Sequence, residues 1–311
     1  MPSLTPLLPP LRSAASFSAA LPRLRRRILA WYARERRELP WRRTRDPWAV
    51  LVSEVMLQQT QGSRVADRFS ELLARFPTPQ AMAQASAADV LVAWSGLGYN
   101  RRAMALQRAA RTVANNGWPR DVNGLRTLPG VGPYTARSVA AIAFGLPVGA
   151  VDTNVRRWLI RRLGLADATR PADLQRLADG LAAAGNASAP DDEAATWMHA
   201  SMEFGARICT ARRPRCAECP IARGCPSRGL DRHVPVSKQA AFEGSPRAAR
   251  GAIVRALADA PGHRLLLAAL PLGNHGRAAV AGLVRDGLAH VTDDEIRLGG
   301  APDAVPSTIG T

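Results

Sequence analysis

The sequence predicts an all-α fold over its first 230 residues, and two observations carry this prediction. Apolar residues recur at helical spacing in successive segments, and glycine and proline residues separate those segments. Strand-like alternation of apolar and polar residues is absent before residue 240. A chain of 311 residues has ample material for a sizeable core and for about two domains.

The charge of the chain indicates the class of its partner. The formal net charge is +17, nearly all of it from arginine because Lys238 is the only lysine. We expect a polyanionic partner, although a genome-wide arginine bias would produce a similar composition. Residues 1–22 have neither a basic start nor an 18-residue apolar span. We therefore expect a disordered segment there, a cytoplasmic location and no membrane association.

The segment from Arg23 to Arg45 holds ten arginines against two glutamates, interleaved with Trp31, Tyr32 and Trp41. A basic face with aromatic anchors suits the backbone of a nucleic acid. A solvated helix whose aromatic side chains enter the core explains Trp31 and Tyr32 equally well.

Glu54 lies in the next expected helix, which starts at Asp46-Pro47. The residues of its apolar stripe are Ala49, Val52, Val55 and Met56. A carboxyl at the edge of such a stripe can have a raised pKa, as a general acid requires, but more often it is simply exposed. Further helices are expected over 67–118, interrupted by the turn SGLGYNRRA, which places Tyr99, Arg101 and Arg102 where they could meet phosphate.

A second glycine-bracketed turn joins two expected helices within Leu125–Asn154. Gly130 and Gly132 flank Val131, so backbone N–H groups there can approach a DNA phosphate without reading bases. A tight helical hairpin buried in a core would have the same form. Asp152, a lone acid in a region crowded with arginine, suggests chemistry on nucleic acid and also suits the N-cap of the following helix.

The chain's four cysteines lie in one short loop with the spacing C-x6-C-x2-C-x5-C: Cys209, Cys216, Cys219 and Cys225. Without an export signal, this favours metal binding over disulfides. Zinc sites usually show two close pairs, whereas this loop has one, and four thiolates can also hold an iron–sulfur cluster. Spacing alone leaves zinc and the cluster open.

After a linker expected at 231–247, residues 248–300 predict a small winged-helix-like module. Helices are expected through 253–257, 265–270 and 280–288, followed by a β-hairpin from His290 to Leu298. Such modules bind DNA or other proteins, so the function of this one stays open. Residues 301–311 are expected to form a disordered tail.

Five motifs occur in this order: LPWRRTRDPWAVLVSEVMLQQT, WSGLGYNRRA, LPGVGPYTA, VDTNVRR and the cysteine loop. Over about residues 24–228 they resemble the A/G-specific adenine DNA glycosylases of the helix-hairpin-helix iron–sulfur superfamily. The resemblance implies a two-lobed all-α glycosylase domain, here 23–230, with a [4Fe-4S] cluster on the cysteines of 209–225. It also implies a monomeric, nucleoid-associated bacterial enzyme that flips adenine from 8-oxoG·A or G·A mispairs in double-stranded DNA and excises it.

The resemblance assigns the chemical roles residue by residue. Glu54 protonates adenine and then activates water, while Asp152 is the carboxylate that faces the oxocarbenium-like sugar. Tyr134 and Asn154 orient the sugar and the aspartate. Arg42 lines the pocket near Glu54.

Other positions match the family's contacts with the duplex. Gln59, beside Thr60, stands at the wedge position that fills the gap left by the flipped adenine. Leu97 and Tyr99 match the residues that, in the family, partner this wedge at the opposite side of the intercalated step. The residues expected at the DNA backbone are Gly130, Val131, Gly132 and Arg101.

The resemblance also distinguishes subclasses and shows departures. Related enzymes that cut the strand carry a Schiff-base lysine just after the glycine turn, where this chain has Tyr134, so a monofunctional glycosylase is implied. The family's Nudix-like domain, which checks for 8-oxoguanine, is replaced by the winged-helix-like tail, as in some actinobacterial members. Two alternatives are a glycosylase that removes thymine from G·T mispairs, against which the SEVMLQQT block argues, and a non-catalytic DNA-binding protein, against which Glu54 and Asp152 argue.

Overall fold

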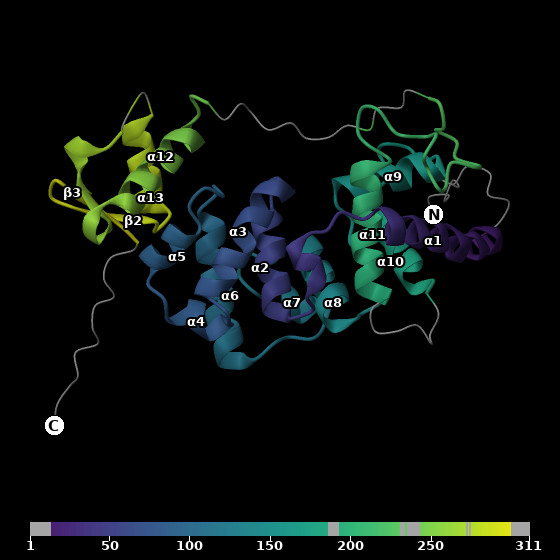
Figure 1. The fold of residues 1–311 in the computed structure, drawn as a ribbon, viewed down its shortest axis with the longest axis horizontal. Coiled ribbons are helices and arrows are strands. Elements are labelled where there is room, and N and C mark those ends of the chain that lie inside the picture. The colour runs from purple at the N-terminus through teal and green to yellow at the C-terminus, as the bar shows by residue number, and fades with distance from the viewer. Residues whose placement is uncertain are drawn as a thin grey trace, which may run out of the picture. The chain divides into compact units, whose positions relative to one another are not determined.

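The computed structural model describes residues 14–185, 193–230, 234, 243–271, 273 and 275–299. The chain forms two compact units, each assembled from separate stretches of sequence. Unit 1 comprises Met1–Glu54, Arg120–Thr127 and Val131–Lys238, and unit 2 comprises Val55–Pro119, Leu128–Gly130 and Gln239–Thr311. Helices dominate (Figure 1), and within the described ranges strands occur only after residue 263, as predicted. None of the described helices is long and apolar enough to cross a membrane.

Unit 1 is a bundle of helices around an aromatic centre. Its elements are α1 (Ala14–Glu35), the 3-10 helix η1 (Pro40–Arg43), most of α2 (Pro47–Leu57), α7 (Val122–Arg126), α8 (Pro133–Phe144), α9 (Thr153–Leu163), α10 (Pro171–Ala183) and α11 (Glu193–Arg207). Helix α11 packs against α1, α8 and α9 (Figure 1). Phe204 meets Trp31 and Trp158 edge to face, with ring centroids 5.9 and 5.8 Å apart.

Two aromatic residues of the arginine-rich segment belong to this core. Trp31 and Tyr32 are buried in it, so the explanation by a core-facing helix is confirmed for both, and Trp41 is buried in η1. The expected disorder of residues 14–22 is wrong, because α1 begins at Ala14. Burial of Leu21 and Leu24 against the unit 1 core stabilises these additional turns. Residues 1–13, in the same expected segment, lie outside the described residues.

The first part of unit 2 is helical, as expected for 67–118. After the end of α2 it contains α3 (Gly62–Arg75), α4 (Pro79–Gln84), α5 (Ala87–Ala93) and α6 (Arg101–Asn116). The hydroxyls of Thr78 and Ser86 accept backbone N–H groups and so cap the starts of α4 and α5. Helix α6 packs on both of these short helices.

The C-terminal module belongs to unit 2 as well. It contains α12 (Pro246–Asp259), η2 (Pro261–His263), β1 (Arg264–Leu266), η3 (Leu267–Ala269), α13 (Gly276–Arg285), β2 (Ala289–Thr292) and β3 (Glu295–Leu298). The strands form an antiparallel sheet in the order β1-β3-β2, which confirms the predicted hairpin. The helix predicted over 265–270 is wrong: Leu265 pairs with Ile296 of β3, and the register of that pairing makes this stretch a strand followed by a 3-10 turn.

Only 234 and 243–247 of the expected linker are described, and α12 begins within it at Pro246. The expected tail 301–311 and Lys238 lie outside the described residues.

Candidate active site and cysteine loop

The hairpin predicted between two helices is confirmed between α7 and α8. Gly130 has φ +80°, and a Cβ at this position would lie 2.7 Å from the Cβ of Ala105, so both the backbone and the packing require glycine. Gly132 is the N-cap of α8, with φ −83° and open space where a Cβ would stand. The first N–H groups of α8 have no intrahelical acceptor, and the hairpin can present them to an anion.

Glu54 is buried in the last turns of α2, with 3% of its surface exposed. The alternative of an exposed glutamate is therefore wrong. Burial raises the pKa of its carboxyl to about 7, although the neighbouring hydroxyls of Ser138 and Tyr134 lower it. The charge of Asp152 adds to the rise in pKa. A carboxyl with this pKa can both donate and accept a proton near neutral pH.

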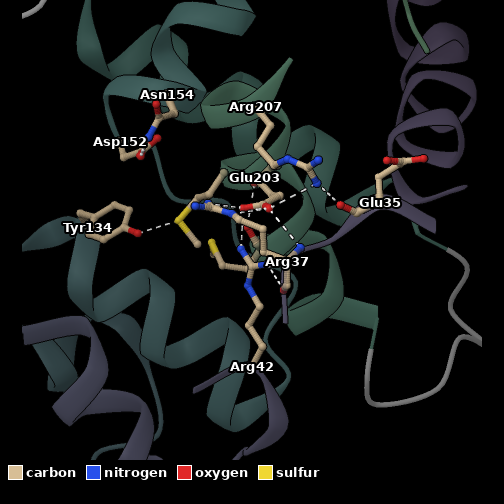
Figure 2. Close-up of polar contacts among 11 residues, drawn as sticks. Glu35, Arg37, Arg42, Tyr134, Asp152, Asn154, Glu203 and Arg207 are labelled. Carbon is tan, nitrogen blue, oxygen red and sulfur yellow. Dashed lines mark hydrogen bonds and ion pairs between the residues drawn. The ribbon is translucent and has the colours of Figure 1, made fainter. Parts of the chain in front are cut away.

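Tyr134 and Ser138 lie one turn apart on α8, and both influence Glu54. Burial raises the pKa of Tyr134 well above its ordinary value, so the phenol keeps its proton. Its hydroxyl lies 2.7 Å from the sulfur of Met202 (Figure 2). Ser138 is fully buried, and although it lowers the pKa of Glu54, its hydroxyl makes no well-aligned hydrogen bond with any described group.

Asp152 is the N-cap of α9, as predicted. Its Oδ1 accepts the backbone N–H of Val155 at 2.6 Å, and its Oδ2 accepts the side-chain N–H of Asn154 at 2.7 Å (Figure 2). Burial raises the pKa of Asp152, and these hydrogen bonds oppose the rise. Because its charge acts on Glu54, the cap also belongs to a pair of interacting carboxyls, and the capping and functional explanations of this residue are compatible.

Arg157 connects this site to the cysteine loop. Its guanidinium donates to Oδ1 of Asn154 at 2.8 Å, to the carbonyl of Gly205 at 2.6 Å and to the carbonyl of Cys209 at 2.7 Å. A Cβ at Gly205 would lie 2.6 Å from the carbonyl oxygen of Asn154, so this glycine permits the close approach of α9 and α11. A single buried side chain thus joins the first cysteine of the loop to the amide that holds Asp152.

Glu203 of α11 is a second buried carboxylate in unit 1 (Figure 2). It accepts two hydrogen bonds from the guanidinium of Arg37, at 2.8 and 2.6 Å, one from the backbone N–H of Arg37 at 3.3 Å, and one from Arg42 at 2.8 Å. Burial alone would raise the pKa of Glu203, but these guanidinium groups hold it at about 2. Arg42, predicted to lie near Glu54, makes its hydrogen bonds to Glu203 and to the carbonyl of Arg37 instead.

The predicted wedge residues lie on two loops of unit 2. Gln59 and Tyr99 are non-glycine residues with positive φ, +56° and +48°. The hydroxyl of Thr60 accepts from Arg102. The guanidinium of Arg102 also donates to the carbonyl of Met56 at the end of α2 and to loop carbonyls, those of Gln58, Leu97 and Gly98. Burial lowers the pKa of Arg102 to about 10, so it remains charged at neutral pH.

The remaining predicted contacts differ in exposure. The side chain of Arg101 is 77% exposed and forms an ion pair with Asp286 at 3.8 Å, so it is accessible to phosphate. Leu97 is 3% exposed, and its insertion into a duplex would require the loop to move.

All four cysteines line one small cavity in unit 1, together with Ile208 and Arg161. No three of the described His, Cys, Asp and Glu side chains are close enough to share a single metal ion. A lone zinc ion would draw its four thiolates to about 2.3 Å from one centre. Cysteines that surround a common cavity without converging on a point fit a multi-iron cluster better.

Cationic groups surround the cysteine cavity. Arg161 lies 3.7 Å from the Sγ of Cys209, and it donates to the carbonyls of Thr210 and Ala211. Burial raises the pKa of the Cys219 thiol to about 11, so metal ligation must supply the driving force for its ionisation. A bound cluster would cross-link the loop and fix the position of Cys209, to whose carbonyl Arg157 is bonded.

Sequence and structure comparisons identify the family. Residues 52–182 match the HhH-GPD superfamily of base excision DNA repair proteins, and residues 209–225 match the iron–sulfur binding domain of endonuclease III. The adenine DNA glycosylase of Mycolicibacterium smegmatis is 42% identical over 282 residues, which cover 86% of this chain and 92% of the relative. This chain belongs to the adenine DNA glycosylase family. The adenine DNA glycosylase of Mycobacterium tuberculosis is 45% identical over 243 residues, 74% of this chain and 77% of the relative.

A solved thermostable thymine-DNA glycosylase shares the fold, with a TM-score of 0.60 and 28% identity over 67% of this chain and 97% of that one. The predicted helix-hairpin-helix class, the base-excision enzyme class and the [4Fe-4S] cofactor are confirmed, and the zinc alternative is wrong. The alternative of a non-catalytic DNA-binding protein is wrong as well.

Three buried residues of this site were not recognised in the sequence: Ser138, Arg157 and Glu203. Arg157 stands in the quoted VDTNVRR motif, where it was indistinguishable from its charged neighbour. Glu203 is an isolated acid within an apolar helical stretch, and this pattern indicates a buried carboxylate.

Proposed function

We propose that this enzyme hydrolyses the N-glycosidic bond of adenine mispaired with 8-oxoguanine or guanine in double-stranded DNA. The observation that supports this most strongly is the pairing of buried Glu54, whose pKa is about 7, with the nearby carboxyl of Asp152. Cleavage of a bond to adenine needs one proton donor and one stabilising negative charge, and this pair can supply both. The 42% identity to a mycobacterial adenine DNA glycosylase adds further support.

In the first step, Glu54 donates its proton to a ring nitrogen of the flipped adenine. The bond between the sugar C1′ and the base nitrogen then breaks, and its electron pair leaves with the neutral base. Asp152 faces the positive charge that develops on the sugar, and the side-chain amide of Asn154 holds the carboxylate in place. Glu54, now ionised, takes a proton from the water that attacks C1′, which yields free adenine and an abasic site.

The surrounding residues hold the duplex. In the proposed complex the neutral phenol of Tyr134 orients the sugar, and the hairpin at Gly130–Gly132 and the exposed Arg101 bind phosphates. Gln59 fills the space left by the flipped base.

We propose that the reaction ends at the abasic site. Strand cleavage through a Schiff base needs an amine at the active site, where this chain has Tyr134, and Lys238 is the only lysine in the sequence. An efficient enzyme–DNA adduct trapped by borohydride would contradict this proposal. We further propose that the enzyme works as a monomer in the bacterial cytoplasm, at the nucleoid.

Single-turnover base release on four duplexes tests the proposed function. The duplexes carry 8-oxoG·A, G·A, G·T or no mispair, and released adenine and thymine are quantified. We expect adenine from the first two and nothing from the undamaged control, and Glu54→Gln should bind the same duplexes but release adenine far more slowly. Thymine release from G·T would instead support the alternative specificity, and the absence of any released base would contradict the proposal.

A further inference from the structure

Two arginines contact the exposed ring of Tyr99. Its side chain projects from a loop whose backbone is in the left-handed region, and 37% of the residue is exposed. The guanidinium of Arg102 lies 5.4 Å from the ring centroid, and that of Arg247 lies 5.7 Å from it. Arg247 also donates a hydrogen bond to the Tyr99 hydroxyl. An aromatic side chain at this exposure would otherwise sample several rotamers.

The second of these arginines comes from the C-terminal module. Arg247 lies in the first turn of α12, and α12 and β3 both pack against α5 within unit 2. Asp286, at the end of α13, forms ion pairs with Arg101 on the Tyr99 side and with Arg250 on α12. The module is therefore attached next to the Tyr99 loop through several independent contacts.

The charge at this place favours a polyanion over an acidic or neutral protein surface. Arg102 and Arg247 lie over the Tyr99 ring, and Arg101 and Arg250 pair with Asp286, so four arginines stand against this one acid in these contacts. An exposed aromatic ring among arginines is the arrangement that binds nucleic acid by stacking a base and neutralising the adjacent phosphates.

We propose that the C-terminal module completes the DNA-binding surface of this enzyme, and that Arg247 holds Tyr99 as a stacking platform for the strand opposite the excised adenine. The inference rests on the proposed function, because it takes the wedge loops to enter the mispaired duplex. Fixing the ring before DNA arrives lowers the entropy lost on binding. The strained φ of Tyr99 is maintained by Arg102, which donates to the carbonyl of Gly98, and by Arg247, which donates to the Tyr99 hydroxyl.

A double-mutant cycle on the full-length holoprotein tests the inference. Fluorescence anisotropy measures the Kd for a duplex with a tetrahydrofuran abasic analogue opposite 8-oxoguanine, for Arg247→Ala, Tyr99→Phe and the double variant. The matched control is Arg255→Ala, an exposed arginine on the same helix. We expect Arg247→Ala to weaken binding about 10-fold, Tyr99→Phe to weaken it comparably and the double variant to lose no more than either. Arg255→Ala should change the Kd less than about 2-fold.

Thermal melting of each variant confirms that the fold is intact, and Tyr99→Phe, which removes only a hydroxyl, provides a second route if Arg247→Ala unfolds. An effect of Arg247→Ala equal to that of Arg255→Ala, or strictly additive effects in the cycle, would overturn the inference and leave the module as a surface for another partner. Adenine release by the wild-type enzyme is recorded in the same preparations. Failure of that release contradicts the proposed function, whereas normal release with equal Arg247 and Arg255 effects contradicts the inference alone.

Discussion

Two buried glutamates of unit 1 have opposite acid strengths. Glu54 is 3% exposed and Glu203 is 1% exposed, yet the pKa of Glu54 is about 7 and that of Glu203 is about 2. Burial raises the pKa of both carboxyls by removing water. Glu203 receives charged hydrogen bonds from Arg37 and Arg42, whereas Glu54 receives only neutral hydroxyl partners.

The difference shows how one helical bundle builds an acid and a permanent anion from the same residue type. Desolvation is common to both positions, so the partners decide the outcome. Glu203 provides a fixed negative charge that ties α11 to the segment of Arg37 and Arg42. Glu54 keeps a proton available at neutral pH, at a cost in folding free energy that a neutral side chain would not have.

Removing the carboxyl at Glu54 should have the largest effect on activity. Glu54→Gln keeps the shape of the side chain but cannot donate a proton, so single-turnover adenine release should fall by on the order of 10³-fold. Binding to an 8-oxoG·A duplex should stay within a few-fold of wild type. A variant that retains a tenth of the wild-type rate would show that Glu54 is not the acid.

Replacing these two glutamates by glutamine should change the stability of the protein in opposite directions. The pKa of Glu54 rises from 4.5 to about 7 on folding, and each unit of such a rise lowers the free energy of unfolding by about 1.4 kcal/mol once the pH exceeds 7, about 3 kcal/mol in total. Glu54→Gln should therefore be more stable than wild type at pH 8 but not at pH 4. Glu203→Gln removes the counter-charge of Arg37, Arg42 and Arg207, and the free energy of unfolding should fall by about 3 kcal/mol at pH 7. The Glu203 contribution is present above pH 4.5 and declines as the pH falls toward 2. Urea unfolding at pH 4 and pH 8 measures both effects. If both variants changed the free energy of unfolding in the same direction at pH 8, the contrast between the two glutamates would be wrong.

Arg157 supports the Asp152 side of the pair from a distance. Arg157→Ala removes the hydrogen bonds to Asn154 and Cys209 and should lower adenine release by about 10-fold or more, with a lower Tm and a less stable visible absorbance of the cluster. Arg156→Ala, its neighbour bonded to the Asp167 carbonyl, is the matched control and should change neither readout. If both variants lost the same activity and stability, positive charge in general would matter and the hydrogen bonds of Arg157 would not.

The smallest predicted effect concerns Ser138. Its hydroxyl lowers the pKa of Glu54, so Ser138→Ala should raise that pKa and move the alkaline decline in rate upward by about half a pH unit to one unit. Ser53 is the control, because it is buried beside Glu54 but donates to the carbonyl of Val50 at 2.9 Å. The pH–rate profile of Ser53→Ala should coincide with that of wild type, and a shift of equal size in both variants would exclude a specific role for Ser138.

Local patterns made much of this fold and site predictable. The helix starting at Asp46-Pro47, the hairpin at Gly130, the N-cap at Asp152 and the cysteine loop each depend on residues a few positions apart. The buried network was not predictable, because its partners lie far apart in sequence: Glu203 meets Arg37 across 166 positions. The prediction of a helix over 265–270 failed for the same reason. The apolar run there is compatible with a helix or a strand, and its pairing with the distant strand β3 decides for a strand.

The pH dependence of single-turnover adenine release from an 8-oxoG·A duplex tests the central claim most directly. If Glu54 is the proton donor with a pKa of about 7, the wild-type rate should be constant at low pH and fall above pH 7, approaching a tenfold loss per pH unit. The residual activity of Glu54→Gln should show no such decline. A wild-type rate that stays constant from pH 6 to about 9 would contradict the assignment of Glu54 as the catalytic acid.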